Sequence, residues 1–507
     1  MLKPANHTNG NGGGSGTRPP VVILGGGPAG LSAAYELSGQ GVRSLVLEKE
    51  SSVGGLARSL QHQGYLFDIG GHRFFTKVPI IEQMWRDVLG EDLLTRPRLS
   101  RVYFRSKFFQ YPLDARNALA GLGPLEALRC LASFVRAHCF PRKPERSFED
   151  WVSNRFGRRL FDMFFRTYTE KVWGIPCNQI GAEWAAQRIR GLSLVSLVWN
   201  SLRPSKNGGQ PIKTLIDEFL YPRQGPGMMW NRVNEIVESR GSRVLLEQGV
   251  DRISWQKGRV LSVTARGETF KAPNFISSIP IRDLIQKLDP PAPRYLRAAV
   301  QDFNYRDFLT VALIVRGNNL FPDNWIYIHD PGFKVGRIQN FNNWSPDMRP
   351  DAETTCLGLE YFCFENDRFW NQPDSELLAL ASREVTALGL VRPGTILGGV
   401  VARVPKAYPI YDDRYERGLA AVRRFLAEET PNLQLVGRNG MHRYNNQDHS
   451  MLTGILAARN VMGADYDLWS VNVDADYLEE YGPRSDEMYA ALSATQPMVP
   501  RRLSAGV

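Results

Sequence analysis

A glycine-rich turn near the start of the chain most constrains its fold. Residues 25–30 (GGGPAG) satisfy the pattern G-x-G-x-x-G, and the apolar run 21–24 (VVIL) precedes them. Residues 31–39 have helical composition, and a second apolar run, 44–47, ends at Glu48. In a β-α-β unit such glycines permit a tight turn and let the backbone approach a pyrophosphate, while an acid ending the second strand binds a ribose diol. The pattern therefore predicts a dinucleotide site in a Rossmann-like α/β domain.

The length of the chain, 507 residues, exceeds what one hydrophobic core usually supports. Helix-forming stretches fill 111–230, short strand-like segments recur over 243–278, and β-rich runs follow over 307–370. A last strand is expected at 434–436 and a helix from near Met451. The predicted division is 1–19 (disordered tail), 20–110, 231–300 and 401–480 (three parts of the dinucleotide-binding domain), 111–230 (helical insertion), 301–400 (β-rich substrate domain) and 481–507 (loose tail).

The charge balance indicates an anionic partner without naming it. The formal net charge is +10, and the basic residues are scattered, with no zinc-finger spacing, RNP-like motif or dense Lys/Arg run. We therefore expect no nucleic-acid partner and no metal. Five cysteines, an odd number with no C-x-x-C spacing, fit reduced and buried thiols, and the first twenty residues lack an apolar signal-peptide core. A cytoplasmic location is expected.

One segment leaves contact with a membrane open. No run of about eighteen apolar residues occurs, so no transmembrane segment is expected. Residues 115–140 are rich in Leu, Ala and Phe, interrupted by Arg116, Arg129, Arg136 and His138. As an amphipathic helix with basic flanks, this segment could lie on a membrane surface. A helix that packs one face on the core is the alternative, and general experience favours it.

The residues after Glu48 favour FAD over NAD. Residues 54–58 (GGLAR) bring backbone close to a cofactor and place an arginine where it can reach phosphates. This pattern resembles the amine oxidase and protoporphyrinogen oxidase superfamily of FAD enzymes, and residues 437–438 and 447–450 resemble its second FAD-binding segment. The resemblance implies a GR2-type FAD-binding domain with an inserted helical domain and a β-rich substrate domain. The implied FAD contacts are Gly25, Gly27, Pro28, Ala29, Gly30, Glu48, Lys49, Gly55, Leu56, Arg58, Gly70, Gly71, His72, Val250, Gly437, Arg438, Asp448, His449 and Ser450.

Further motifs resemble the UDP-galactopyranose mutases, especially the eukaryotic type. Residues 67–75 (FDIGGHRFF) are similar to the loop that these enzymes place beside the flavin ring, and 171–176 (KVWGIP) and 325–327 (WIY) are similar to segments that precede their two diphosphate-binding arginines. Arginine suits this task because its planar fork binds phosphate with two hydrogen bonds. The resemblance implies substrate contacts by Trp184, Arg188, Trp325, Tyr327, Arg337, Tyr408 and Tyr444, and catalytic roles for Gly71, His72, Arg188 and Arg337.

These resemblances imply a sugar-nucleotide mutase in which N5 of reduced FAD attacks the anomeric carbon. The net reaction is redox-neutral, but the flavin must first be reduced, and NAD(P)H is one candidate reductant. An FAD-dependent oxidoreductase that removes hydride from an amine, porphyrinogen, polyene or sugar carbon is the alternative, and a flavin-bearing binding protein ranks third.

Two departures from the mutase pattern leave the substrate open. Asp114 follows Tyr111 where eukaryotic mutases have a glutamine that contacts uridine, so the base is not determined. The spacing from Tyr444 to residues 446–449 is shorter than in those mutases, which leaves the place of Tyr444 open. The oligomeric state cannot be predicted from these motifs.

Overall fold

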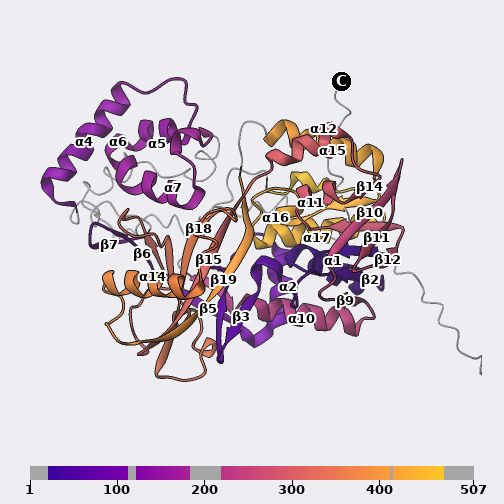
Figure 1. The fold of residues 1–507 in the computed structure, drawn as a ribbon, viewed down its shortest axis with the longest axis horizontal. Coiled ribbons are helices and arrows are strands. Elements are labelled where there is room, and N and C mark those ends of the chain that lie inside the picture. Colours follow the sequence, from indigo (N-terminus) through magenta and orange to yellow (C-terminus); the bar gives the residue numbers. More distant parts are fainter. Residues whose placement is uncertain (1–20, 112–121, 183–217, 411–414, 473–507) are drawn as a thin grey trace, which may run out of the picture.

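A computed structural model of the chain describes residues 21–111, 122–182, 218–410 and 415–472. Trp184, Arg188, Asp114 and the two expected tails lie outside the described residues. Figure 1 shows three regions: a half built on a parallel sheet, a large antiparallel sheet beside it, and a group of helices at the upper left. In the described part of the chain no helix is long and apolar enough to cross a bilayer.

A five-stranded parallel sheet forms the core of the first region. Its order is β20-β13-β1-β2-β9, with β1 in the middle. Every residue of β1 and β2 is buried, which explains why both strands are continuous apolar runs and do not alternate. The strands are β1 (Val21–Leu24), β2 (Ser44–Leu47), β9 (Arg243–Leu245), β13 (Asn274–Ser277) and β20 (Leu433–Leu435).

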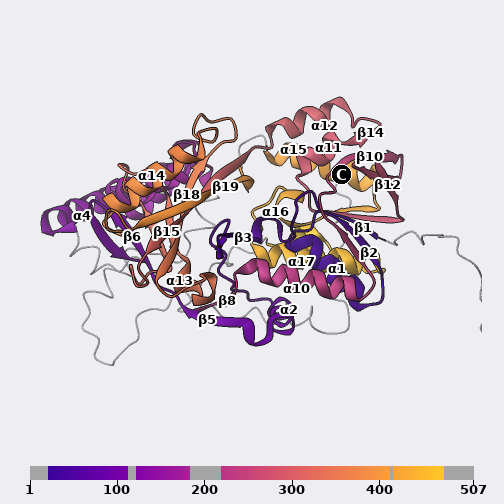
Figure 2. The same ribbon diagram turned by 60° about the horizontal axis from the view of Figure 1, so that its bottom comes forward.

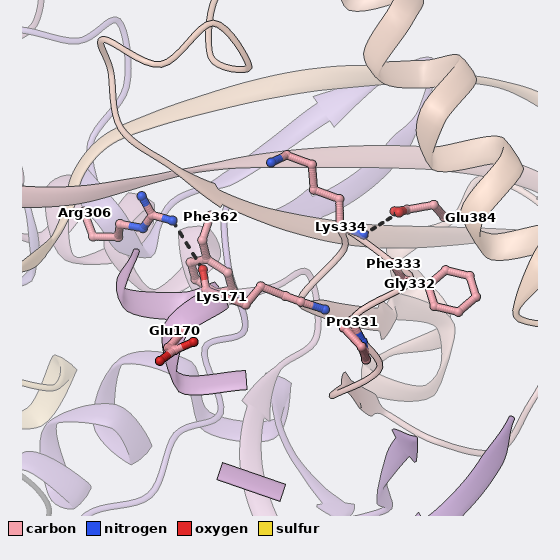
Figure 3. Close-up of a pocket in the computed structure, with 9 residues that line it drawn as sticks. All are labelled: Glu170, Lys171, Arg306, Pro331, Gly332, Phe333, Lys334, Phe362 and Glu384. Atoms are coloured by element: carbon pink, nitrogen blue, oxygen red, sulfur yellow. Dashed lines mark hydrogen bonds between the residues drawn. The ribbon is translucent and has the colours of Figure 1, made fainter. Parts of the chain in front are cut away.

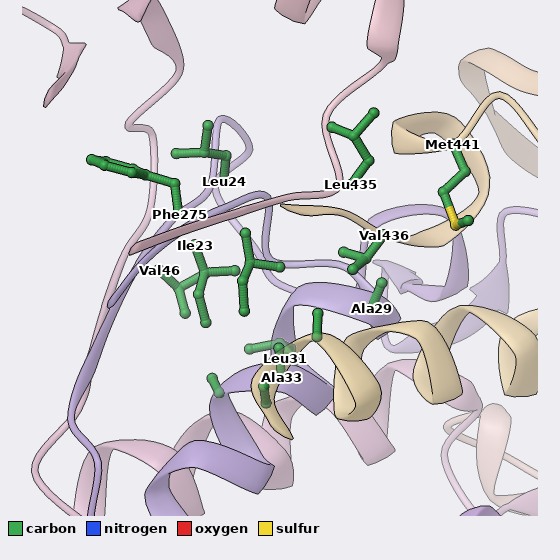
Figure 4. Packing of buried hydrophobic residues seen from close by; sticks show 14 of the residues in the cluster. Ile23, Leu24, Ala29, Leu31, Ala33, Val46, Phe275, Leu435, Val436 and Met441 are labelled. Carbon is green, nitrogen blue, oxygen red and sulfur yellow. The ribbon is translucent and has the colours of Figure 1, made fainter. Parts of the chain in front are cut away.

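Helices α1 and α17 cross closely on one face of this sheet, where their small and aliphatic side chains meet the strands (Figure 4). β1 pairs with β2 on one side and with β13 on the other. The order in which successive strands are added to the sheet therefore reverses at β1, and ligands bind at such a point in folds of this type. The helices around the sheet are α1 (Pro28–Gly39), α2 (Pro79–Leu89), α10 (Pro226–Ser239), α16 (Gly437–Gly440) and α17 (Gln447–Val461).

Three smaller sheets complete this half. A four-stranded sheet has the order β12-β11-β10-β14, and two antiparallel two-stranded sheets pair β3 with β4 and β5 with β8. These strands are β3 (Ser59–His62), β4 (Tyr65–Asp68), β5 (Leu93–Pro97), β8 (Glu218–Pro222), β10 (Val250–Gln256), β11 (Arg259–Ala265), β12 (Glu268–Lys271) and β14 (Leu288–Asp289). The helices beside them are α11 (Ile281–Gln286), α12 (Arg294–Ala299) and α15 (Tyr415–Glu429).

The second region is a seven-stranded sheet of order β19-β15-β18-β17-β16-β6-β7 (Figure 2). All neighbours are antiparallel except β6 and β16, which run parallel. The strands are β6 (Ser100–Phe104), β7 (Lys107–Gln110), β15 (Tyr305–Arg316), β16 (Trp325–Ile328), β17 (Arg337–Asn340), β18 (Thr354–Cys363) and β19 (Ile396–Pro409). Helices α13 (Phe341–Trp344) and α14 (Asp374–Ala387) accompany this sheet.

Side chains of this sheet alternate between two faces, as the pleat requires. Leu309, Val311 and Leu313 point toward α14, whereas Phe308 and Ala312 join a second cluster with β4 and β8. The face opposite α14 therefore lies against the half that contains the parallel sheet.

The third region, the helical insertion, packs against the outer end of the seven-stranded sheet. Its helix α5 starts with a capping box, in which Ser147 and Asp150 satisfy each other's backbone amides. The described elements are α4 (Pro124–Cys139), α5 (Phe148–Phe156), α6 (Arg158–Leu160), a π-helical turn at Phe161–Arg166 and α7 (Thr167–Trp173).

The structure confirms the α/β fold class and corrects several local expectations. The range 111–230, expected to be helical, includes the strand β8 and the start of α10, and Trp230 lies in the core of the parallel sheet. Tertiary pairing with β5 decides the conformation of β8, which the local sequence did not indicate. Helix α17 starts at Gln447, ahead of Met451, because Asn446 caps it. Cys139 is exposed, contrary to expectation, because its helix presents it to solvent.

Candidate active site

The turn after β1 requires glycines because larger residues would clash with neighbouring protein atoms. Gly25 has φ +99°, and a Cβ atom on Gly30 would lie 2.0 Å from the Gly25 carbonyl oxygen. Pro28 and Ala29 start α1, with Gly27 as the N-cap residue, so the helix N-terminus opens at this turn. Such a terminus directs amide hydrogens and a partial positive charge at a bound phosphate.

Glu48 is held at the end of β2 by backbone amides. The amide of Gly26 donates to its Oε2 at 2.6 Å, and the amide of Glu50 donates to Oε1 at 2.9 Å. The Gln248 amide donates to the Glu48 carbonyl at 2.7 Å, which brings the strand that starts at Val250 to the same edge. Glu48 and Val250 thus lie on one side of the turn, while the Lys49 side chain is exposed and pairs with Glu50 at 3.3 Å.

A second glycine pair packs directly on the first turn. Gly54 donates its amide to the Gly26 carbonyl at 2.9 Å, and a Cβ atom on Gly55 would lie 3.1 Å from the Gly27 Cα. Arg58 follows, mostly buried, with its guanidinium 3.9 Å from the Glu50 carboxylate. Residues distant from Gly27 in the chain therefore form one backbone surface with it.

The C-terminal segment returns to the same place. Gly437 has φ +76°, and a Cβ there would lie 2.9 Å from the Cβ of Ala29. Its amide donates to the Thr453 hydroxyl at 2.9 Å. The buried first turn of α17 contains Asp448, His449 and Ser450. The structure thus brings segments from both ends of the chain together around the N-terminus of α1.

The loop at Gly70–His72 connects this surface to the seven-stranded sheet. A Cβ on Gly71 would lie 1.7 Å from a ring carbon of Trp325, so only glycine fits against the indole. One ring nitrogen of His72 is hydrogen bonded to the backbone of Leu56, and Nε2 meets no partner among the described residues. Burial lowers the pKa of His72 to about 4, and the positive charge of Arg438 acts in the same direction. The imidazole is therefore neutral, with Nε2 available as an acceptor.

A row of side chains crosses the sheet beside this loop. Tyr327, Arg337 and Glu360 are cross-strand partners on β16, β17 and β18, so the register places them side by side on the face opposite α14. Arg337 Nη2 lies 2.6 Å from Glu360 Oε2 and donates to the Tyr408 hydroxyl at 2.8 Å. The amide of Gly71 donates to Glu360 Oε1 at 3.2 Å. The carboxylate thus ties the loop at Gly71 to the guanidinium.

The ionisation of this pair follows from its burial. Glu360 is fully buried, and burial raises the pKa of its carboxyl while Arg337 lowers it. Burial, the largest single effect, lowers the pKa of Arg337, but Glu360, Tyr408 and Tyr168 together raise it well above its ordinary value. At a separation of 2.6 Å we take the pair as ionic. Nε of Arg337 meets no hydrogen-bond partner in the described part of the chain.

Aromatic rings line both sides of Arg337. Trp325 and Tyr327 stack with centroids 5.7 Å apart, and the guanidinium of Arg337 lies 5.0 Å from the Trp325 ring. Tyr408 and Tyr444 stack at 5.7 Å. Arg438 lies 4.7 Å from the Tyr444 ring, so it connects the segment at Gly437 to the tyrosines.

Several residues of this region escaped the sequence analysis. Glu360 is the clearest, since a lone acid in the apolar run 354–363 was a signal of a buried, paired charge. Tyr168 on α7 stacks on His329 at 4.5 Å and meets the Tyr327 ring edge-on at 5.7 Å. Lys171, one turn later, begins the motif 171–176, but its role could not be predicted: it donates to the carbonyls of Ile328, Asp330 and Val335. These two side chains fasten the helical insertion to the strands that carry Tyr327 and Arg337.

A pocket of about 430 Å³ lies next to Lys171, and Phe362, Arg306 and Glu384 are among the residues that line it (Figure 3). Its polar groups already have partners. Arg306 donates to the carbonyls of Lys171 and Val172, and the carboxylate of Glu384 accepts from the amides of Lys334 and Val335. These hydrogen bonds hold the strands behind the row in place, and they leave few polar groups in the pocket for a ligand.

Comparison with known proteins identifies the family. The family described as flavin containing amine oxidoreductase matches residues 28–462, most of the chain. The chain belongs to this family. Two L-amino acid oxidases show short matches: Cdc18 of Crotalus durissus cumanensis is 42% identical over 66 residues, and the enzyme of Crotalus adamanteus is 43% identical over 63 residues. The matches span 13% and 12% of the length of these curated relatives.

Two solved structures show how far the fold likeness extends. Reduced UDP-galactopyranose mutase has a TM-score of 0.78 at 23% identity, covering 90% of this chain and 96% of that chain. Putrescine oxidase bound to putrescine has a TM-score of 0.58 at 17% identity, covering 88% and 99%. The protein therefore has the fold of the flavin-containing amine oxidoreductases, and the family implies an FAD-dependent enzyme.

The residues present fit FAD. Gly25, Gly30 and Gly55 pack so closely on neighbouring protein atoms that side chains would not fit, and the backbone they form is a cradle at the N-terminus of α1. A buried acid, Glu48, ends the adjacent strand. The acceptor Nε2 of His72 lies at the other end of the site, beside Gly71, which packs on Trp325, and within reach of the charges of Arg438 and Arg337. This arrangement suits a long cofactor with a diphosphate in its middle.

Proposed function

We propose that this flavoenzyme is a sugar-nucleotide mutase that uses reduced FAD. The observation that supports it most is the placement of Arg337, with the tyrosines 327 and 408, next to the glycine loop at Gly71. A desolvated guanidinium beside hydroxyl donors is suited to a diphosphate leaving group, because the donors are fixed before charge develops. When bound in its reduced form, FAD would supply a nucleophilic nitrogen for the anomeric carbon.

The protein's own residues have separate tasks in this proposal. Arg337 and Tyr408 hold the diphosphate, and Trp325 forms a flat wall beside Gly71. Glu360 positions Arg337 and the Gly71 amide together. His72, neutral and with a bare Nε2, accepts a proton or hydrogen bond at the reactive end of the cofactor. Arg188 and Trp184 complete the substrate contacts in this proposal.

The alternative, an oxidase, rests on the matches to L-amino acid oxidases. A guanidinium that binds phosphate can equally bind the carboxylate of an amino acid. Arg337 alone therefore does not separate the two activities.

One experiment separates them. The purified holoenzyme is incubated with UDP-, GDP- and dTDP-linked hexoses after anaerobic reduction by dithionite, and in parallel aerobically with L-amino acids and with the same sugars. We expect a ring isomer of one nucleotide sugar, formed only when the flavin is reduced. Oxygen consumption and flavin bleaching with an amino acid, without any isomer, would establish the oxidase and reject the mutase.

Variants of Arg337 test the site itself. Arg337→Lys keeps the charge but loses the two-pronged hydrogen bond, and we expect at least about a tenfold rise in KM, with the yellow flavin retained. Arg316→Ala is the matched control, because this exposed arginine ends β15 of the same sheet away from the row. Loss of flavin from Arg337→Lys, with an unchanged KM in the remainder, would show that the arginine serves the cofactor and not the substrate.

The organisation of the chain belongs to the same proposal. Residues 20–110, 231–300 and 401–480 would bind FAD, apart from β6, β7 and β19, which pair in the seven-stranded sheet. Residues 301–400 and the helical insertion would shape the substrate site. We place the enzyme in the cytoplasm, where reduced nicotinamide is at hand as a source of electrons.

A further inference from the structure

Helix α4 exposes an apolar face that the proposed function does not use. In the described part of the chain, five of the twelve exposed large hydrophobic side chains belong to α4 and its C-cap residue. Their exposed fractions are high: Leu125 62%, Leu128 63%, Leu131 48%, Val135 52% and Phe140 79%. A contiguous apolar patch of this kind on a folded protein indicates an interaction surface.

The inner face of α4 is firmly packed, so the outer face stays outward. Cys130 is buried in a cluster with Phe104 and Phe164. The Ser133 hydroxyl accepts the amide of Arg159 at 3.1 Å, and a Cβ on Gly157 would lie 2.7 Å from the Phe134 backbone nitrogen. The exposure is therefore a property of the folded insertion. In both Figure 1 and Figure 2, α4 lies at the outer edge of the molecule, away from the parallel sheet.

Basic residues flank this face. Residues 124–143 contain Arg129, Arg136, Arg142 and Lys143 but only one acid, Glu126. Glu126 is mostly buried, where its carboxylate accepts hydrogen bonds from Arg159 and lies 3.6 Å from Nη1 of Arg129. Since one acid faces several basic side chains, the exposed rim of the face carries net positive charge.

The spacing of these charges disfavours a second copy of the chain as the occupant. Leu125, Leu128 and Val135 follow the spacing of a helix-pairing stripe, and Arg129 and Arg136 lie directly beside it. In an antiparallel pair of such helices, the arginines of the two copies would face each other and repel. An anionic surface has no such conflict, because it attracts the rim and accepts the apolar side chains.

We propose that the outer face of α4 binds the surface of an anionic lipid bilayer. Leu125, Leu128, Val135 and Phe140 enter the boundary between headgroups and acyl chains, and Arg129 and Arg136 contact the lipid phosphates. The protein then associates peripherally, with the helical insertion as its attachment point.

Vesicle sedimentation tests the proposal with the full-length holoenzyme under reducing conditions. One set of vesicles contains phosphatidylcholine alone, and the other also contains about 30% phosphatidylglycerol. The assay is run at about 0.1 M salt, where attraction between charges is still effective. We expect binding to the anionic vesicles and weak binding to the neutral ones. Arg129→Gln combined with Arg136→Gln should weaken binding by about thirtyfold.

Matched variants at apolar positions distinguish binding through this face from non-specific hydrophobic adsorption to the vesicles. Leu128→Glu and Val135→Glu should each lower vesicle binding at least about tenfold, since each buries a charge in place of an aliphatic group. Leu397→Glu and Tyr295→Glu, at exposed apolar positions elsewhere, should leave it unchanged. Absent binding to anionic vesicles, or binding insensitive to Leu128→Glu, overturns the proposal. A concentration-dependent dimer that Leu128→Glu abolishes would assign the face to a second copy and also overturn it.

Discussion

Asp68 is a buried carboxyl group with no cation beside it among the residues that the structure describes. Its oxygens accept hydrogen bonds from the hydroxyls of Tyr221 at 2.6 Å and Ser59 at 2.9 Å. Burial raises the pKa of Asp68 from its ordinary 3.8 to about 7, against the effect of these two hydroxyls. Asp68 ends β4, directly before the loop at Gly70–His72, so its protonation state bears on the packing of that loop.

This shift predicts a pH dependence of stability. Between about pH 4 and 7 the native state binds the Asp68 proton and the unfolded state does not, so the free energy of unfolding falls as pH rises. Asp68→Asn removes this contribution, which is on the order of a few kcal/mol. Urea unfolding of both proteins at pH 5 and pH 7.5 measures it. A difference between wild type and variant that is the same at both pH values would contradict the raised pKa.

The buried pair of Arg337 and Glu360 predicts non-additive stability effects. Glu360→Gln leaves the guanidinium buried without its counterion, and we expect a loss of about 3 kcal/mol in the free energy of unfolding. Arg337→Gln likewise leaves the Glu360 carboxylate buried without a counterion. The double variant should be more stable than the sum of the two losses predicts, by at least about 1 kcal/mol. Additive losses in denaturant unfolding would show that the two side chains do not interact.

At the scale of elements, the crossing of α1 and α17 holds together the N-terminal and C-terminal segments of the proposed cofactor site. Gly454 lies on α17 where the helices touch, and a Cβ there would lie 2.1 Å from the Ala29 carbonyl oxygen. Ala29 belongs to the first turn of α1, which in our proposal faces the cofactor diphosphate. A displacement of α17 would therefore move both Gly437 and the first turn of α1.

Gly454→Ala tests this crossing. Alanine normally stabilises a helix over glycine by about 1 kcal/mol, but here the clash should reverse the sign and destabilise the protein by about 1–3 kcal/mol. FAD affinity should fall with it. Gly398→Ala on β19, where a Cβ would meet nothing within 4 Å, is the control and should change neither property. Fluorescence titration of free FAD and thermal unfolding measure both effects, and a stabilised Gly454→Ala protein would contradict the geometry.

At the scale of the whole molecule, the proposed FAD site joins segments from opposite ends of the chain. Gly27 packs on Gly55, and Gly437 packs on Ala29 of the same helix turn, although these glycines come from three different stretches of sequence. A ligand held there connects these stretches only in the native state. Binding and global stability are therefore linked.

Reconstitution of the apoprotein measures this linkage. Free FAD at a hundred times its Kd should raise the free energy of unfolding by about 2.7 kcal/mol, in a single transition that includes the far end of the parallel sheet. ADP, which reaches only the half of the site near Glu48, serves as the comparison ligand and should also stabilise. A melting temperature that does not respond to FAD would contradict the assignment of the cradle.

The sequence alone determined the β1-α1-β2 unit, its glycine turn and the acid at Glu48, because neighbouring residues fix such a unit through local sterics and hydrogen bonds. It also identified the loop at Gly70–His72 and Arg337, although only by resemblance. Local pattern could not assign β6 and β7 to the seven-stranded sheet or β8 to its pairing with β5, since partners distant in sequence supply their hydrogen bonds.

Tertiary structure alone decided which charges and apolar faces are covered. Glu360 meets Arg337 and the Gly71 amide because the register of β17 and β18 and the path of a distant loop bring them together. The amphipathic pattern of 115–140 fitted either a buried or an outward apolar face. Packing of Cys130 and Ser133 on the insertion turned Leu128 and Val135 toward solvent. Periodicity defines the faces of a helix, but only the neighbours in space determine which face remains exposed to solvent.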